Sequence, residues 1–342
     1  MVSNMAEIRN VVFVDFLVDK SWSFTKSLEK NTELKWIGKG WNNSGNQKNK
    51  FDVLKRYVLY FWYAFVIFLN RRKYDRIVAW QQFYGLLFAL YCSLFRVKKI
   101  NKLIIMTFIF KERQGKFASL YKAMINRIVR SEYVDKFVVF SKNEVEYYSQ
   151  LFGVDKSKFC YSPLGIEDKP EIKDGIEAND LFFLSVGRSN RDYEFLVDAL
   201  NGTDYNVVIL TDMPPKVENL SSNIKIFTNV EGYNYLRFLD KCYGVIIPLK
   251  DKNISSGQLV MLRAMQFKKP VVITESNTLS DYIVDNENGI VINKNKQDLF
   301  LALDKLLQDK KLYNRLAEQG YSVYEQSFSL DALAKNIGKI AK

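Results

Sequence analysis

Short apolar runs alternate with longer amphipathic stretches along the whole chain. Four runs lie in the first half, at 11–15, 76–80, 103–108 and 136–140, and six in the second, at 181–186, 206–210, 224–227, 244–248, 270–274 and 289–292. Apolar runs of this length, separated by helical patterns, are typical of strands in parallel sheets that helices cover on both faces. The pattern predicts an α/β fold with two doubly wound sheets.

A polar segment separates the two halves. Residues 162–175 hold two of the six prolines, two glycines and a dense set of charges, which is the composition of a linker. A chain of 342 residues is also long enough for two domains of about 150 to 170 residues each. We predict an N-terminal domain of residues 1–168 and a C-terminal domain of residues 172–325.

Composition limits the chemistry. The chain has no histidine, so catalysis has to use carboxylates, backbone groups, Arg, Lys or the substrate itself. Three scattered cysteines, Cys92, Cys160 and Cys242, predict neither a disulfide nor a zinc framework. Residues 1–32 lack the pattern of a secretory signal, and we expect a cytoplasmic protein with no metal and no resident cofactor.

Positive charge is concentrated in the first half. The formal net charge is +12, and between Arg96 and Arg130 ten Lys or Arg face a single acid, Glu112. This excess implies an anionic partner: a nucleic acid, a phospholipid or a phosphorylated substrate.

Two segments decide among these partners. Residues 57–70 are almost entirely apolar between basic flanks, yet fourteen residues are too few to span a bilayer core of about 30 Å. They form either a buried helix or an interfacial one, whose headgroup side would carry Tyr57, Tyr60, Phe61 and Trp62. In 116–130 the bases lie largely off an apolar helical stripe, as in a membrane-surface helix or a solvated basic face. Because no nucleic-acid motif accompanies them, both segments favour an anionic membrane surface.

Two loops carry candidate phosphate-binding chemistry. Gly187, Arg188 and Ser189 follow the run 181–186 and lead into a helical pattern, where backbone N–H groups and a guanidinium attract phosphate. After the run 244–248, the loop residues that precede the next helix are Ser255, Ser256, Gly257 and Gln258. Plain helix capping is the alternative for each loop. Two such loops at the carboxyl edge of one sheet predict a ligand site.

Other polar residues follow strands as well. Arg191 lies one turn beyond Arg188, near enough to share an anion, although an ion pair with Asp192 or Glu194 is the alternative. In the first domain, the residues at or just after strand ends are Trp80, Gln81, Gln82, Thr107 and Lys111. They are candidate acceptor contacts, with turn formation as the alternative.

From about residue 136 onward the sequence resembles glycosyltransferase family 4. The resemblance is carried by FSKNE at 140–144, YSPLG at 161–165, VGR at 186–188, MLRAMQFKKPVV at 261–272 and DNENGIV at 285–291. It implies the GT-B architecture, two Rossmann-like doubly wound domains facing across a cleft, with donor binding in the C-terminal domain. It also implies that a last helix, about 326–342, packs back on the N-terminal domain.

The chain departs from that family at its acidic motif. Ser255 and Arg263 stand where the two glutamates of E-x7-E would be, as in a divergent branch with a serine-glycine-glutamine loop. The resulting candidates are Arg188 and Arg191 for catalysis, and for donor binding Gly187, Ser189, Ser255, Ser256, Gly257, Gln258 and Arg263.

The resemblance implies retaining transfer from a nucleoside diphosphate sugar, most simply a UDP-sugar, to a lipid-linked saccharide. Such an enzyme would serve bacterial surface polysaccharide synthesis, on the inner face of the membrane. Loss of both glutamates leaves a non-catalytic GT-B-fold partner subunit as the alternative. Nucleic-acid binding through residues 96–130 is a third interpretation.

Overall fold

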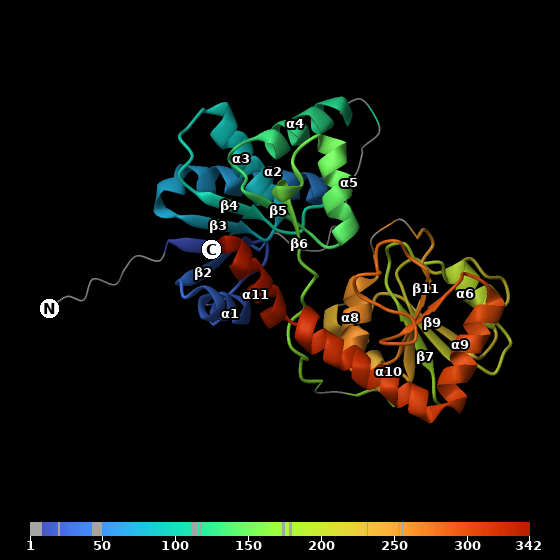
Figure 1. Cartoon of the computed structure of the whole chain (residues 1–342). Helices are drawn as coiled ribbons and strands as arrows, with labels where there is room; N and C mark the ends of the chain where they lie inside the picture. Colours follow the sequence, from blue (N-terminus) through green and yellow to red (C-terminus); the bar gives the residue numbers. More distant parts are fainter. Residues whose placement is uncertain are drawn as a thin grey trace. The chain divides into compact units, whose positions relative to one another are not determined.

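The chain divides into two compact units. One comprises Met1–Pro163 with Leu333–Lys342 and the other Leu164–Ala332 (Figure 1). The computed structural model describes residues 9–19, 21–42, 50–110, 115, 118–172, 175–177, 180–230, 232–252, 254 and 256–342. Each unit has its own parallel sheet and its own hydrophobic core.

The first unit is built on a six-stranded sheet in the order β2-β1-β3-β4-β5-β6. All pairs are parallel. The strands are β1 Asn10–Val14, β2 Trp36–Gly40, β3 Arg76–Ala79, β4 Lys102–Ile105, β5 Lys136–Val139 and β6 Phe159–Tyr161. Because the chain goes from β1 to one side and then returns to the other, the strand order reverses between β1 and β3.

Helices cover this sheet. They are α1 Ser23–Thr32, α2 Lys50–Leu69, α3 Gln82–Leu94, α4 Ala118–Arg130, α5 Lys142–Phe152 and α11 Leu330–Ala341, with short 3₁₀ turns at Arg71–Lys73 and Lys156–Lys158. A core shared with α2, α3, α4 and α5 packs on one face of the strands. α5 begins with a capping box between Ser141 and Glu144. The end of the chain belongs to this unit, where Arg76 Nε donates to the Ala341 carbonyl at 2.8 Å.

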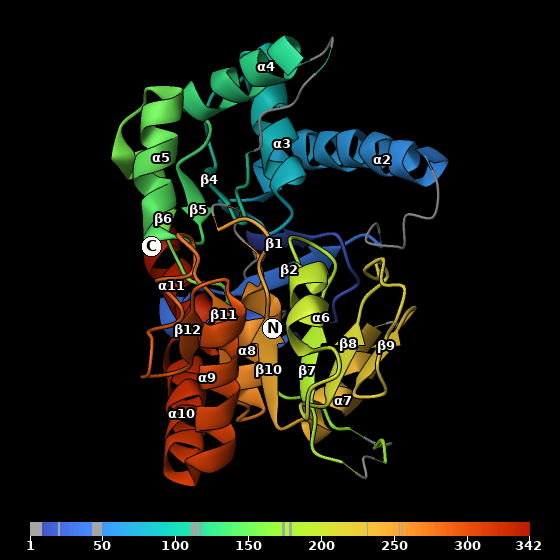
Figure 2. The same cartoon turned by 90° about the vertical axis from the view of Figure 1, so that its right-hand side faces the viewer.

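The second unit is built on a six-stranded sheet in the order β12-β11-β10-β7-β8-β9, also all parallel. Its strands are β7 Phe183–Val186, β8 Val207–Leu210, β9 Ile224–Phe227, β10 Gly244–Ile247, β11 Val271–Thr274 and β12 Ile290–Ile292. Its helices are α6 Tyr193–Leu200, α7 Tyr235–Lys241, α8 Gln258–Gln266, α9 Lys296–Gln308 and α10 Lys310–Val323, with a 3₁₀ turn at Gly232–Asn234 and a π-helix at Tyr324–Phe328. One core joins the sheet to α6 and α9, and another joins it to α7 and α8 (Figure 2).

The two parallel sheets confirm the predicted fold class, while β2 and β6 are strands that the pattern did not predict. β2 reads WIGKG and is only half-buried along most of its length. Its Gly40 is required by close packing, because a Cβ there would stand 1.8 Å from the Phe16 carbonyl oxygen. Because Gly and Lys are uncommon in strands, the residues of β2 do not form a recognisable strand pattern.

The apolar segment 57–70 lies in α2 except for its last residue, Asn70, and it has a buried and an exposed face. Tyr60 is buried at 3% exposure, which corrects its assignment to a headgroup side, whereas Trp62 is 59% exposed. No helix within the described residues is both long and apolar enough to cross a membrane.

Candidate functional site

The second sheet reverses its strand order between β7 and β10, so the loops that follow these strands meet at its carboxyl edge. Arg191 and Leu249 form an antiparallel bridge between the two loops. The Asp192 amide donates to the Pro248 carbonyl at 2.8 Å, and the Lys250 amide donates to the Asn190 carbonyl at 3.2 Å. The loops therefore run side by side.

Asn190 joins these loops through its side chain. Its backbone has a φ of +56°, in the left-handed region that asparagine tolerates better than most residues. Nδ2 donates to the Asp251 carbonyl at 2.8 Å and to Ser256 Oγ at 3.0 Å, while Oδ1 accepts from the Asp251 amide at 2.9 Å. The Asn190 side chain thus holds the loop after β7 to the loop after β10.

Two glycines with positive φ lie beside the guanidinium of Arg191. φ is +132° at Gly187 and +93° at Gly257. A Cβ at Gly187 would stand 2.9 Å from Arg191 Nη2, and one at Gly257 would stand 3.8 Å from Arg191 Nη1. Tyr193 fixes the first glycine further, since its hydroxyl donates to the Gly187 carbonyl at 2.7 Å. The guanidinium therefore occupies space that a side chain at Gly187 would fill.

Arg191 is a half-buried cation whose hydrogen bonds go only to carbonyls. Nη1 donates to the Ser189 carbonyl at 2.9 Å and Nε to the Val186 carbonyl at 3.3 Å. Within the described ranges no carboxylate lies within 4 Å of it. Burial lowers the pKa of Arg191, because desolvation disfavours its charged form. An anionic ligand would compensate this charge.

Neighbouring cations at the same edge do have carboxylate partners. The pairs are Arg188 with Asp212 at 3.6 Å, Lys252 with Glu275 at 3.7 Å and Lys294 with Asp192 at 3.0 Å. The alternative of an ion pair between Arg191 and Asp192 is therefore wrong, because Asp192 bonds Lys294 and caps α6 through the Phe195 amide. Arg188 itself is 74% exposed in its side chain.

The other predicted donor residues divide into two groups. Gly187, Ser189, Ser256, Gly257 and Gln258 lie on the two loops or at the start of α8. The structure does not bring Arg263 to these loops: it is buried, and its Nη1 donates to the Glu167 carbonyl at 2.9 Å and to Gln266 Oε1 at 2.6 Å. These contacts hold the segment that enters the second unit. Ser255 lies outside the described residues.

In the first unit, Gln81 directly precedes α3 at the carboxyl edge of β3. Its Oε1 accepts from the Phe83 amide at 3.3 Å, which caps α3. Its Nε2 donates to Asp15 Oδ2 at 2.9 Å and to the Tyr60 hydroxyl at 3.2 Å. Gln81 is thus both a capping residue and a member of a polar cluster.

The remaining acceptor candidates lie nearby along β3 and β4. Thr107 has a φ of +55°, and its Oγ1 donates to the Trp80 carbonyl at 2.8 Å. Trp80 packs edge-on against Phe24, with ring centroids 4.9 Å apart. Gln82 Oε1 accepts from the Ile109 amide at 3.1 Å. Lys111 lies outside the described residues.

Sequence reasoning missed Asn190 and Asp15 as site residues. Asn190 lies between Gly187 and Arg191. Asparagine tolerates positive φ, so an asparagine in this short loop could have indicated a tight turn at the site. Asp15 ends the first apolar run, so its place at a strand end was visible. No group of three or more Cys, Asp or Glu that could hold a metal ion occurs in the described part of the chain.

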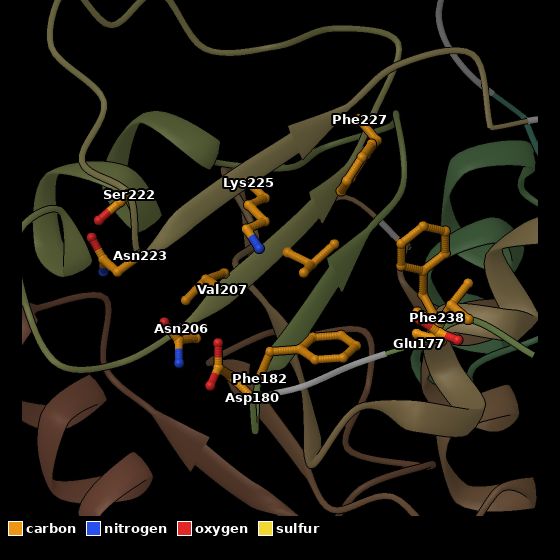
Figure 3. A pocket seen from close by; sticks show the side chains of 12 residues that line it. Glu177, Asp180, Phe182, Asn206, Val207, Ser222, Asn223, Lys225, Phe227 and Phe238 are labelled. Atoms are coloured by element: carbon orange, nitrogen blue, oxygen red, sulfur yellow. The ribbon is translucent and has the colours of Figure 1, made fainter.

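A separate hollow of about 260 Å³ lies elsewhere in the second unit (Figure 3). Its lining includes Asp180, Asn206 and Asn223, which precede β7, β8 and β9. The amino ends of these strands form the edge opposite to the two loops. This hollow is therefore distinct from the site around Arg191.

Comparisons with known proteins agree with the fold. Residues 168–323 match the model of the family Glycosyl transferases group 1. An uncharacterized glycosyltransferase of Methanocaldococcus jannaschii is 24% identical over 174 residues, 48% of each chain. D-rhamnosyltransferase WbpZ of Pseudomonas aeruginosa is 23% identical over 237 residues, 64% of this chain and 61% of WbpZ. The chain thus spans about half to three-fifths of the curated relatives it matches.

Among solved structures, Anabaena Alr3699/HepE in complex with UDP has a TM-score of 0.63 at 13% identity. The likeness covers 97% of this chain and 99% of that one, and it shows the fold alone. Together with the two parallel sheets, it assigns the chain the GT-B architecture of two Rossmann-like domains. Residues 168–323, which hold most of the second unit, are thus similar to the family Glycosyl transferases group 1.

Proposed function

We propose that the protein is a glycosyltransferase that transfers a sugar from a nucleoside diphosphate sugar to a saccharide acceptor. The observation that carries this proposal is the half-buried guanidinium of Arg191, which lies beside Gly187 and Gly257 and lacks a carboxylate partner in the described residues. A diphosphate would supply the missing negative charge. The glycines would let it approach the backbone closely.

The same arrangement suits the chemistry of the transfer. Negative charge grows on the diphosphate as the glycosidic bond breaks, and fixed cations and helix N-termini stabilise that charge. Arg191 and Arg188 supply the cations, and α8 begins directly after Gly257. This arrangement can serve without a metal. Retention of the anomeric configuration follows from the family resemblance.

Uridine is the nucleotide we propose. Support comes from the solved structure of HepE, which is similar in fold and is in complex with UDP. We further propose that the acceptor is a lipid-linked saccharide and that the enzyme serves bacterial surface polysaccharide synthesis.

A surface of α2 supports contact with the inner face of a membrane. The α2 surface consists of the exposed apolar residues Phe51, Leu54, Val58, Phe61, Trp62 and Leu69. Apart from the neighbours Phe61 and Trp62, they follow one another at intervals of three, four or seven residues, which places them along one side of the helix. Arg71, Arg72 and Lys73 follow after Asn70, and bases beside an apolar, aromatic surface suit anionic headgroups.

Nucleotide binding by the intact chain tests the proposal. Thermal unfolding is measured with UDP, GDP, ADP and CDP, and hydrolysis and transfer are followed with the matching nucleotide sugars. We expect UDP to raise the unfolding temperature and UDP-sugars to be turned over. Absence of any nucleotide effect would contradict the proposal. Binding with neither hydrolysis nor transfer would instead indicate a non-catalytic partner subunit.

A further inference from the structure

One face of the second sheet is only partly covered at its edge strand, β9. On this face α7 packs against β7, and α8 packs against β10 and β11. A helix is about 10 Å wide and covers about two strands that lie about 4.8 Å apart, so neither helix extends fully over β9. Phe227 of β9 is accordingly 41% exposed, and the hollow of about 260 Å³ lies beside it on β8 and β9.

Apolar side chains form the floor and one end of this hollow. Val208 on β8 and Phe182, which precedes β7, belong to the same core and are 8% and 6% exposed. Phe227 and Phe238 stand together at one end, with ring centroids 5.5 Å apart (Figure 3). This part of the hollow suits an apolar group of a small ligand.

Asp180 and Asn206 bring acceptor oxygens to the same hollow (Figure 3). Asn206 Nδ2 donates to the Leu181 carbonyl at 3.2 Å, which joins Asn206 to the segment that carries Asp180. No group of the described residues donates to Asn206 Oδ1. An amide oxygen and a carboxylate both accept hydrogen bonds, so together they suit an ammonium group.

Lys225 brings the opposite charge. Its Cα partner on β8 is Val208, so its side chain lies on the face of the sheet that carries the hollow. Asp180 and Glu177 line the same hollow, but no carboxylate of the described residues lies within 4 Å of the Lys225 ammonium. Charges of both signs are therefore held apart around one hollow. A simple anion would meet two carboxylates there and a simple cation would meet the ammonium, whereas a zwitterion complements both signs.

We infer that this hollow binds a free α-amino acid with an apolar side chain. The carboxylate of the ligand would accept from Lys225, and its ammonium would donate to Asp180 and Asn206. Its side chain would lie against Phe227 and Phe238. The volume is slightly below the range of about 300 to 1,000 Å³ that is typical of small-molecule sites, which suits an amino acid better than a nucleotide sugar. This inference goes beyond the proposed function and does not depend on it.

The hollow and the site around Arg191 lie at opposite ends of the same strands. β7 and β8 have four residues each, and four residues of a parallel strand extend about 13 Å. An amino acid in the hollow would therefore not compete with a nucleotide beside Arg191. Saturating UDP should leave amino acid binding in place.

The test measures calorimetric binding of leucine, isoleucine, methionine and phenylalanine to the full chain. Two analogues of leucine serve as matched ligands: isoamylamine lacks the carboxylate, and isocaproate lacks the ammonium group. We expect leucine to bind. Each analogue should bind at least about tenfold more weakly than leucine, because each loses a hydrogen bond to a charged group.

Two variants assign the charges of the ligand to residues. Lys225→Met and Asp180→Asn change exposed side chains, so both variants should fold as the parent does. Each should bind leucine about tenfold more weakly. Lys225→Met should not weaken the binding of isoamylamine, and Asp180→Asn should not weaken that of isocaproate, because these analogues lack the group that the replaced residue contacts.

Matched controls come from the same unit. Lys216 and Asp204 are exposed and do not line the hollow. Lys216→Met and Asp204→Asn should leave leucine binding within about twofold of the parent, less than the effect of one lost hydrogen bond.

Four results would overturn the inference: a parent that binds no apolar amino acid, an analogue that binds as tightly as leucine, site variants that bind leucine as the parent does, or controls that lose binding equally. Leucine binding that UDP abolishes would place the ligand beside Arg191 and would also reject the inference. Binding of UDP itself bears only on the proposed function.

Discussion

Replacing Arg191 by methionine should weaken donor binding without weakening the fold. Methionine keeps an unbranched chain of similar length and removes the charge. In the ligand-free protein the variant loses hydrogen bonds to the Ser189 and Val186 carbonyls, at 2.9 and 3.3 Å. Their loss costs about 1 kcal/mol each.

The variant also loses the penalty of desolvating a cation that pairs with no carboxylate of the described residues, an effect of several kcal/mol for a fully buried ion. Arg191 is only half-buried, so we expect the relieved desolvation penalty to offset the lost hydrogen bonds. The free energy of unfolding should therefore stay the same or rise by up to about 2 kcal/mol. Two charge-assisted bonds to a diphosphate are worth about 3 to 6 kcal/mol, or roughly 10² to 10⁴ in Kd. Stability and affinity should thus move separately.

The assay is denaturant unfolding with and without UDP, together with calorimetric measurement of the UDP Kd. Lys252→Met is the matched control, because it removes an exposed cation that is paired with Glu275 at the same edge. The control should alter UDP affinity by less than threefold, as expected for a surface charge. An Arg191→Met protein that unfolds much more easily yet binds UDP normally would refute the reasoning, because it would make Arg191 a structural residue.

Three further predictions concern other parts of the molecule. Arg188→Ala should lower turnover about a hundredfold, with a smaller loss of donor affinity and partial recovery by Arg188→Lys, and steady-state kinetics with near-normal turnover would contradict it. The double variant Lys122→Glu, Arg127→Glu should sediment less with anionic vesicles, because each base contributes about 1 kcal/mol to the free energy of membrane binding at low salt. UDP binding should persist. Equal sedimentation of variant and parent would reject the membrane contact. Gly257→Ala should destabilise the protein by about 1 to 2 kcal/mol in denaturant unfolding, because φ is +93° there and the new Cβ would stand 3.2 Å from Ile247 Cγ2. An unchanged unfolding midpoint would show that the loop relaxes freely.

Most of the fold could be predicted from the sequence because the central strands are buried on both faces. Each residue of 244–247 is buried, for example, and such a strand reads as a continuous apolar run. The strand β2 escaped prediction because it is only half-buried and carries Lys39 between two glycines. A strand of five residues that is only half-buried has too few apolar positions to predict a strand.

The candidate site was harder to predict, because its electrostatics depend on distant residues. Among the described residues no carboxylate pairs with Arg191, partly because Asp192 bonds Lys294, which comes from the loop after β12, 102 residues after Asp192. Likewise, the partner of Asp15 is Arg56 on α2, and nothing local in the sequence pairs them. The loop glycines could be recognised from the neighbouring residues in the sequence. Which carboxylate pairs with which cation could not, because the partners are distant along the chain.

The hydrogen bonds of Asn190 have a consequence for changes in chain length. A single insertion or deletion in either loop would shift the bridge between Arg191 and Leu249 and break the bonds from Asn190 to Asp251 and Ser256 at the same time. The loops can therefore accept side-chain substitutions separately, but they can change length only together. Anyone who transplants this site into another scaffold has to move residues 187–192 and 248–258 as a pair.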